Sequence, residues 1–318
     1  MQKEIMAGVE RQIHPAEIRE LFINLDPVTT WDKVHAIVHM INRDTDMSMV
    51  RDVFDDVMCL FDGSFPGYSP IQTPYHDLRH TLDVFMCTAR LLHGVHISGA
   101  QLTSDDIALL LIAALLHDVG YAQRFEEASG SGAQFTQVHV PRGIMFMRQR
   151  LADWHLPAHW EASLSAIFNC TAPPHDLSQV QFPSAHVRLL GQIVGTADLI
   201  GQMADRCYLE KLLFLYVEFK EADIGGFHDM QDLFRRTRSF YEQIRSILDT
   251  EFDPVYLKLQ YHFKASMGVE RNFYMESVER NIEYLEQVMR LNESEWTSML
   301  KRHGFALAYK QLNHQPSA

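Results

Sequence analysis

The chain has 318 residues, 47% of them hydrophobic and 22% charged, with 16 glycines and 12 prolines. This composition is typical of a globular protein with a large core, and it excludes disordered, collagen-like and coiled-coil chains. Asp and Glu (41) outnumber Lys and Arg (28), which gives a formal net charge of −13. Because a negative chain without a basic stripe repels nucleic-acid backbones, we expect no nucleic-acid partner.

The longest uninterrupted apolar run, residues 107–116, is ten residues long. A bilayer-spanning helix needs about 20, so the sequence predicts no membrane span and no membrane partner. Glu4 stands where a secretory signal needs basic residues, and we therefore expect a cytoplasmic protein. The cysteines lack C-x-x-C spacing, which predicts reduced thiols rather than a zinc or disulfide framework; they are Cys59, Cys87, Cys170 and Cys207.

Apolar residues recur at three- and four-residue spacing along most of the chain, the pattern of amphipathic helices. Period-two alternation, the pattern of a strand, is confined to short stretches such as residues 179–182. The sequence therefore predicts an all-α fold. The expected helices cover residues 31–41, 47–61, 76–92, 105–117, 140–151, 160–169, 185–205, 208–221, 230–248, 271–291 and 295–309.

No break in composition divides the chain, so we predict one helical core over residues 66–221. Helical extensions over 1–65 and 222–318 are expected to pack on it. The polar, glycine-containing loop 122–134 is a candidate lid. Aromatic residues of the C-terminal extension are expected to fill the core, with an oligomer interface or a nucleotide pocket as alternatives; they are Phe252, Tyr256, Tyr261, Phe263, Phe273, Tyr274 and Tyr284.

Histidine is the unusual residue of this composition, with 17 copies, and it is the commonest transition-metal ligand. Of four His-Asp pairs, His117-Asp118 ends an apolar helix, where both side chains would be costly to bury unless they bind a cation or form hydrogen bonds. The pairs at 175–176 and 228–229 follow prolines or glycines and are expected in solvated loops.

Two further segments place metal-ligand residue types on helices. The helix predicted from residue 76 carries His76 and His80 four residues apart, on one face. Asp198 lies inside the apolar helix predicted over 185–205, where a carboxylate needs a partner.

In chain order these residues read His80, then His117-Asp118, then Asp198. This order resembles the ligand signature of the HD-domain metal-dependent phosphohydrolases. Residues 75–84 also resemble the Y-H-N-x-x-H-x-x-D-V motif of class I cyclic-nucleotide phosphodiesterases. The resemblance covers roughly residues 74–205 and implies an HD-domain helical bundle.

The resemblance also implies a role for each matching residue. His76 would donate a proton to the leaving oxygen, and Asp118 would bridge two divalent ions and take part in catalysis. Zn, Mn, Fe or Ni suits the first ion, and Mg or Mn suits the second. The implied metal ligands are His80, His117, Asp118 and Asp198.

The sequence departs from the phosphodiesterases at several positions. Tyr121 stands where their H-D-x-x-H pattern has its second histidine, Asp77 replaces the asparagine of the first motif, and no purine-clamping glutamine can be located. The H-D-G-Y-P motif of cyclic-di-GMP hydrolases is absent. His139 is a candidate second-metal ligand that would compensate for Tyr121, with a capping or surface role as the alternative. Arg142 is expected to be solvated rather than substrate-facing.

Three functions are consistent with these residues. The leading hypothesis is a metal-dependent phosphodiesterase that hydrolyses a cyclic nucleotide. The first alternative keeps the metal site but cleaves nucleotide phosphomonoesters or pyrophosphates. The second is a non-catalytic helical scaffold or ligand sensor. A small-molecule nucleotide is the expected partner, and a homodimer is left open.

Overall fold

The computed structural model describes residues 13–22, 26–127, 129–292, 295–296, 299–300 and 302. These residues form twelve α-helices and one two-stranded antiparallel sheet, so the predicted all-α fold is confirmed. The helices are α1 (Pro15–Glu20), α2 (Pro27–Ile41), α3 (Ser48–Asp62), α4 (Leu78–Ile97), α5 (Ser104–Leu116), α6 (His139–Arg150), α7 (Trp160–Asn169), α8 (Ala185–Ala204), α9 (Tyr208–Glu221), α10 (Met230–Thr250), α11 (Leu259–Met267) and α12 (Phe273–Met289). The strands are β1 (Tyr68–Ser69) and β2 (Gln123–Arg124).

The short stretch with strand-like alternation at 179–182 forms no strand. Residues Leu177–Gln179 form a 3₁₀ turn instead, because the Asp176 carboxylate accepts a hydrogen bond from the backbone N–H of Ser178. Of the last predicted helix, 295–309, only residues 295–296, 299–300 and 302 are among the described residues. Helices α1 and α11 were not predicted, because six and nine residues are too few to show a clear 3.6-residue period.

Two long helices, α4 and α5, form the centre of the fold. Helix α5 begins at a capping box, in which the Thr103 hydroxyl accepts from the Asp106 N–H and the Asp106 carboxylate accepts from the Thr103 N–H. Every residue from Ile107 to Leu116 is buried, as expected for a helix that is apolar all round. Helix α4 packs against α2, α5, α8 and α11. The residues that begin α4 and end α5 therefore lie inside the molecule.

Helix α4 begins later than the sequence suggested. Asp77 is its N-cap, and its carboxylate accepts a hydrogen bond of 2.9 Å from the backbone N–H of His80. His76 therefore lies in the loop before the helix, and the prediction that it shares a helical face with His80 is wrong. The capping role of Asp77 gives this position a structural reason to be acidic.

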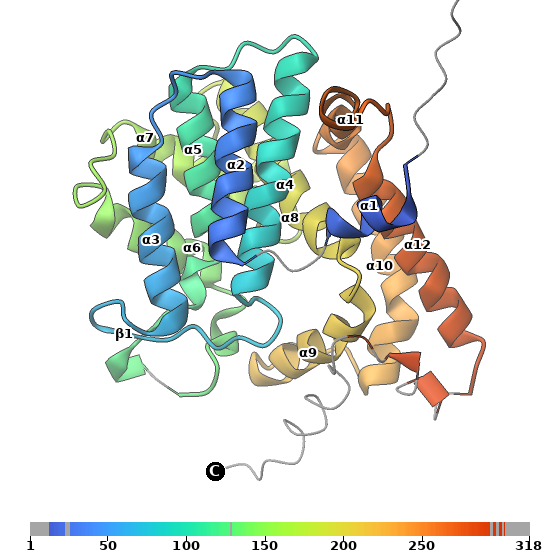
Figure 1. Ribbon diagram of the computed structural model, residues 1–318. Coiled ribbons are helices and arrows are strands. Elements are labelled where there is room, and N and C mark those ends of the chain that lie inside the picture. The colour runs from blue at the N-terminus through green and yellow to red at the C-terminus, as the bar shows by residue number, and fades with distance from the viewer. Residues whose placement is uncertain are drawn as a thin grey trace, which may run out of the picture.

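The C-terminal helices pack against α4, α8 and α9, and the N-terminal helix joins them. Helix α11 contacts α4, α12 contacts α8, and α10 contacts α9 and α12. Figure 1 shows the three in orange and red on one side of the molecule, with the blue α1 next to them. Phe22 meets Tyr274 edge-on with 5.0 Å between ring centroids. The Arg90 guanidinium of α4 donates to the Tyr274 hydroxyl and to the Leu21 carbonyl. One continuous hydrophobic core thus includes residues from both ends of the described chain.

Core packing of the C-terminal aromatic residues is confirmed for most of them. Phe252, Phe263 and Phe273 are fully buried, and Tyr256 and Tyr274 are almost fully buried. Tyr261 and Tyr284 are partly exposed. All four cysteines are free thiols. Among the described residues, no helix combines the length and the apolar character needed to cross a bilayer.

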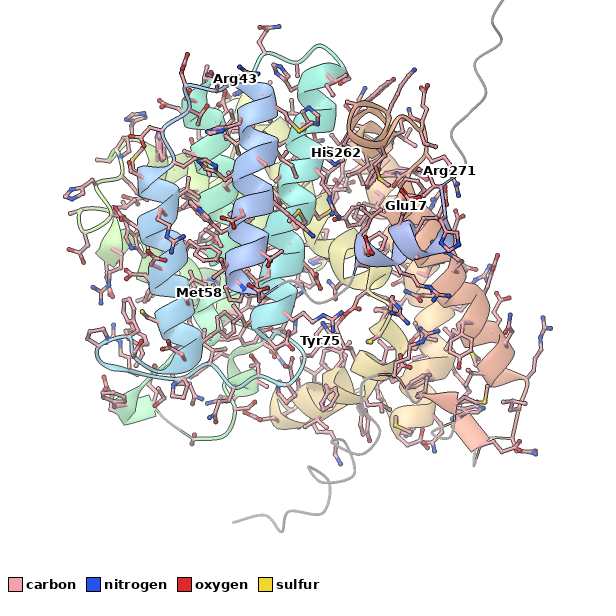
Figure 2. The ribbon with its side chains drawn as sticks, in the orientation of Figure 1. Glu17, Arg43, Met58, Tyr75, His262 and Arg271 are labelled. Atoms are coloured by element: carbon pink, nitrogen blue, oxygen red, sulfur yellow. The ribbon has the colours of Figure 1, made fainter. Side chains whose placement is uncertain are left out.

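A pair of buried histidines joins α4 to α11. Nδ1 of His93 lies 2.9 Å from Nδ1 of His262, which is labelled in Figure 2 where the two helices meet. Burial and the nearby His96 lower the pKa of His93 to about 4. Burial, Arg90 and His93 lower the pKa of His262 to about 2. Both imidazoles are therefore neutral in the folded protein.

We predict that this pair makes the fold sensitive to acid. Unfolded histidines take up protons below about pH 6.5, whereas the folded pair resists protonation down to about pH 4. The free energy of unfolding should therefore be intact above pH 6.5. It should fall as the pH drops from 6.5 toward 4, by up to about 1.4 kcal/mol per pH unit for each histidine.

Urea unfolding at several pH values measures this dependence. The double variant His93→Asn/His262→Asn removes both titrating groups, and it should lose less stability than the wild type between pH 6.5 and pH 4. Parallel curves for the two proteins would contradict the prediction.

Candidate metal centre

Three helices bring the four predicted ligands together in the interior. His80 lies in the first turn of α4. His117 is the C-cap of α5, directly after Leu116, and Asp118 follows it. Asp198 lies in the middle of α8. All four are buried. Since α5 is apolar from Ile107 to Leu116, its end carries His117 and Asp118 into the core.

Helix α8 is held firmly at the turn that precedes Asp198. A Cβ atom on Gly195 would lie only 2.8 Å from the Cys170 carbonyl oxygen and 2.6 Å from the Phe252 ring. Only glycine permits this close packing. The helix is therefore fixed against α7 and the C-terminal aromatic residues just before it supplies its carboxylate.

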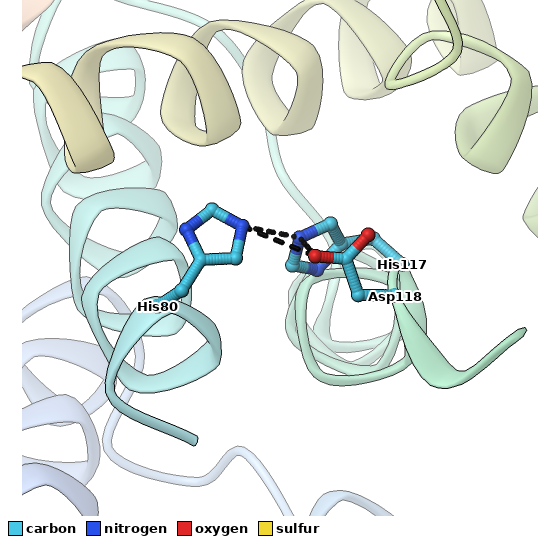
Figure 3. A group of neighbouring side chains, drawn as sticks. All are labelled: His80, His117 and Asp118. Carbon is cyan, nitrogen blue, oxygen red and sulfur yellow. Dashed lines mark hydrogen bonds and ion pairs between the residues drawn. The ribbon is translucent and has the colours of Figure 1, made fainter. Parts of the chain in front are cut away.

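The donor atoms of the four side chains converge. Nε2 of His80 and Nε2 of His117 are 3.1 Å apart, and Asp118 Oδ2 lies 3.2 and 3.1 Å from them, as the dashed lines in Figure 3 show. Asp198 Oδ1 is 3.3 Å from the His80 nitrogen and 3.7 Å from the His117 nitrogen. Donors bound at about 2.1 Å to one ion are separated by roughly 3.0 to 3.4 Å, so the spacing suits a shared cation.

The hydrogen bonds of the site also suit a cation. Nδ1 of His117 lies 2.8 Å from the Ala114 carbonyl oxygen, so this nitrogen donates its proton to the backbone, and Nε2 is the nitrogen whose lone pair a metal ion can use once its own proton has left. Asp118 Oδ2 is buried and accepts no hydrogen bond, although two imidazole nitrogens lie close to it. A buried carboxylate oxygen without a hydrogen bond is costly, and an ion at this point would compensate it.

The charges of the cluster depend on one another. Burial alone would lower the pKa of His80, but the neighbouring carboxylates of Asp118 and Asp198 outweigh it and raise the pKa to about 10. The pKa of His117 is raised for the same reason, mainly by attraction to Asp118. The two carboxyl groups have lowered pKa values, since attraction to the histidines outweighs burial. A metal entering this cluster must displace protons from the imidazoles.

His139 approaches the other oxygen of Asp118. It is buried at the start of α6, and its Nε2 is 3.6 Å from Asp118 Oδ1. Its Nδ1 lies 2.7 Å from the Thr136 carbonyl oxygen, so Nε2 again keeps its lone pair. Burial lowers the pKa of His139, which leaves it neutral. Asp118 thus faces the His80–His117 pair with one oxygen and His139 with the other, and the surface alternative for His139 is wrong.

Glu218 is a residue of the site that the sequence analysis missed. It lies on α9 with a side chain that is 0% exposed, and its Oε2 is 2.5 Å from Nδ1 of His76. Its other oxygen accepts hydrogen bonds from the backbone N–H groups of Tyr75 and His76. Burial lowers the pKa of His76, but attraction to Glu218 prevails and raises it. An acid between Val217 and Phe219 in an apolar helix was the signal that could have revealed it.

Two other sequence predictions, those for Arg142 and His175, need correction, and a second arginine near the site is also paired. Arg142 is neither solvated nor directed at a substrate, because it donates to the Gly120 and Ala122 carbonyls and to Glu127. Arg79 pairs with Asp205 at 2.8 Å. His175 is buried rather than solvated, since its ring packs edge-on against Phe252 and its Nδ1 bonds the Cys170 carbonyl.

Comparison with known proteins gives little further information on the site. A family model described as Npun_R2479-like, an uncharacterised family, matches residues 124–260. The matched region is under half of the chain and includes His139, Asp198 and Glu218 but not His80, His117 or Asp118. No curated protein matches the chain.

We predict that the variants His80→Ala, Asp118→Ala and Asp198→Ala lose bound transition metal while keeping their helical circular dichroism. Each removes a donor atom of the converging cluster. The loss of affinity should exceed the roughly 10- to 100-fold that follows removal of an outer partner of a metal ligand.

Elemental analysis after incubation with Zn²⁺ or Mn²⁺ and dialysis measures the bound metal. His186→Ala is the matched control, because this exposed histidine also pairs with a carboxylate, that of Asp106. Full metal content in Asp118→Ala would exclude the site.

We predict further that His139→Ala removes one of two binding events and leaves the other. His139 contacts only the Oδ1 side of Asp118, so the His80–His117–Asp198 side should keep its ion. Calorimetric titration of the metal-free protein distinguishes the two events. Identical titrations of the variant and the wild type would show that His139 holds no ion.

Proposed function

We propose that this protein is a metal-dependent phosphohydrolase that cleaves a phosphodiester, with a cyclic nucleotide as the substrate class. One observation carries the proposal. A buried cluster of imidazole and carboxylate donors, with Asp118 facing two sides, lies beside a histidine whose position is fixed by a buried glutamate.

The donor set fits divalent cations. His80, His117 and Asp198 would hold one ion together with Oδ2 of Asp118, while Oδ1 and His139 would hold a second. Mixed imidazole and carboxylate donors suit Zn, Mn, Fe or Ni at the first position, and the oxygen of Asp118 also suits Mg or Mn at the second. When bound, such ions supply Lewis-acid chemistry: they polarise phosphoryl oxygens and lower the pKa of water.

His76 is the residue proposed to move a proton. Its side chain is 17% exposed, more than those of the four ligands, and so it is reachable by a substrate. Glu218 occupies Nδ1 and raises the pKa of the ring, which favours the protonated form of the imidazole. Nε2 of His76 is then free to donate a proton to the leaving oxygen as the phosphorus–oxygen bond breaks.

The basic side chains around the site favour a phosphodiester over a more highly charged phosphate. Lys211 and Arg79 are both engaged by Asp205, at 3.1 and 2.8 Å. Arg142 is engaged by Glu127. These side chains therefore cannot neutralise the additional charges of a pyrophosphate or triphosphate. A phosphodiester carries a single negative charge, which the proposed metal ions suffice to balance.

A substrate screen tests the proposal. Metal-loaded protein should hydrolyse bis(p-nitrophenyl) phosphate faster than p-nitrophenyl phosphate, and cyclic mononucleotides or cyclic dinucleotides faster than dNTPs. The reverse order would favour the phosphomonoester or pyrophosphate alternative. Absence of bound metal, with no thermal stabilisation on adding it, would favour the non-catalytic scaffold. A nucleotide substrate would agree with the cytoplasmic location expected from the sequence. Whether the protein forms a homodimer is still open.

We predict that His76→Ala keeps both metals but slows hydrolysis in a way that depends on the leaving group. A ribose alkoxide needs a proton to leave, so loss of a general acid should slow this reaction by about 10²- to 10⁴-fold. p-Nitrophenolate leaves without a proton. The loss on the aryl ester should therefore be much smaller, as steady-state kinetics on both substrates would measure. An equal loss on both, with missing metal, would instead make His76 a ligand.

A further inference from the structure

A tyrosine ring is packed between the two histidines on either side of the site. The Tyr121 ring is stacked on His139 with 4.9 Å between centroids and an angle of 8° between planes. The same ring is also stacked on His76, at 4.7 Å and 20°. Tyr121 is only 1% exposed. The rings of His76, Tyr121 and His139 therefore form one three-ring stack across the site.

The backbone fixes the middle ring of this stack. Tyr121 closes the 3₁₀ turn Val119–Tyr121 that follows Asp118 directly, and its N–H donates to the Asp118 carbonyl. A Cβ atom on Gly120 would lie 1.8 Å from the His139 carbonyl oxygen, so only glycine lets the turn press against the start of α6. Arg142 of α6 donates to the Gly120 carbonyl as well. The phenol ring thus has little freedom to turn or shift.

Each outer ring of the stack has one hydrogen bond that leaves a rotation open. Nδ1 of His76 is bonded to Glu218, and Nδ1 of His139 is bonded to the Thr136 carbonyl. A single hydrogen bond fixes one atom of an imidazole but does not fix the plane of its ring. Contact with a parallel, immobile ring does fix that plane, and so it sets the direction in which Nε2 points.

We infer that Tyr121 is a positioning residue that orients His76 and His139 together through the contacts of its ring with both imidazoles. This inference rests on the proposed function, in which His76 donates a proton and His139 holds an ion. Tyr121 acts through its ring plane and not through its hydroxyl. Tyr121 occupies the position where the phosphodiesterase pattern has a histidine. In place of an imidazole, this position thus has a phenol ring that contacts both His76 and His139.

Three variants of the full chain test the inference. Tyr121→Phe keeps the ring and removes the hydroxyl, whereas Tyr121→Leu keeps an apolar side chain and removes the ring. Phe146→Leu is the matched control, since it makes the same change at a buried ring that packs on Phe65 and Trp154, about two helical turns along α6 from His139. Tyr121→Met, which fills the space with a flexible chain, replaces Tyr121→Leu if that variant does not fold.

The first readout needs no activity. In histidine-selective NMR spectra of the metal-free protein, ring-current shifts of His76 and His139 should persist in Tyr121→Phe and in Phe146→Leu and disappear in Tyr121→Leu. Calorimetric titration should show the His139-dependent binding event weakened about 2- to 10-fold in Tyr121→Leu, the size expected when a ring-stacking contact is lost. The other binding event should be unchanged.

The second readout is kinetic. In Tyr121→Leu the ratio of kcat on the cyclic nucleotide to kcat on the aryl ester should fall about tenfold, toward the ratio of His76→Ala, with little change in KM. A folded Tyr121→Leu with wild-type ring shifts and a wild-type ratio would overturn the inference. So would Tyr121→Phe losing as much as Tyr121→Leu, because the hydroxyl would then be responsible. If the wild type hydrolyses neither substrate while the ring shifts and titrations change as expected, the proposed function fails and the positioning role stands.

Discussion

The structure depends on one constraint, which is that two imidazoles and two carboxylates must meet in a nearly dry interior. Isolated charges in such a place are strongly unfavourable. Here each group compensates another, since Asp118 and Asp198 lie within 3.7 Å of both His80 and His117. The arrangement requires α4, α5 and α8 to approach closely at one point. The apolar surface of α5 and the glycine turn of α8 make that approach possible.

A second polar network keeps these helices in place. Asp205, just after α8, receives Arg79 from α4 and Lys211 from α9. Its carbonyl accepts a hydrogen bond from Asn281 of α12. The network therefore joins four helices directly behind His80, which follows Arg79 in the chain. Because every charge in it is paired, removal of one partner would leave an uncompensated buried charge, the costly case for such networks.

The residues of the buried His–Asp cluster and most helices were predictable from the sequence because each has a local signal. Helix α5 shows a capping box and a continuous apolar run, and His117-Asp118 is conspicuous at its end. Contacts between distant segments have no such signal. Glu218 meets His76 across 142 positions of the chain, and nothing near either residue specifies that pairing. The burial of His175 and the internal hydrogen bonds of Arg142 were missed for the same reason.

Local signals also misled where one side chain outweighed the periodicity. Apolar spacing predicted that the helix begins at residue 76, but the Asp77 cap makes α4 begin two residues later, at Leu78. This difference matters for the site. A His76 within the helix would be tied to the backbone geometry of α4, whereas in the loop it is held by Glu218 of α9 and by the Tyr121 ring.

The packing of α11 on α4 has a consequence for how the chain can be divided. Residues 66–221 include every proposed ligand. This segment is nevertheless incomplete, because α11 covers one face of α4. Cutting the chain after α9 would strip that face of Phe263 and His262 and would expose apolar surface along the helix that supplies His80. A fragment of this kind is expected to aggregate before its chemistry can be assayed. The segment after residue 221 is thus part of the scaffold of the site. Loss of activity after a deletion at this end of the chain would therefore reflect damage to the scaffold rather than removal of a regulatory segment.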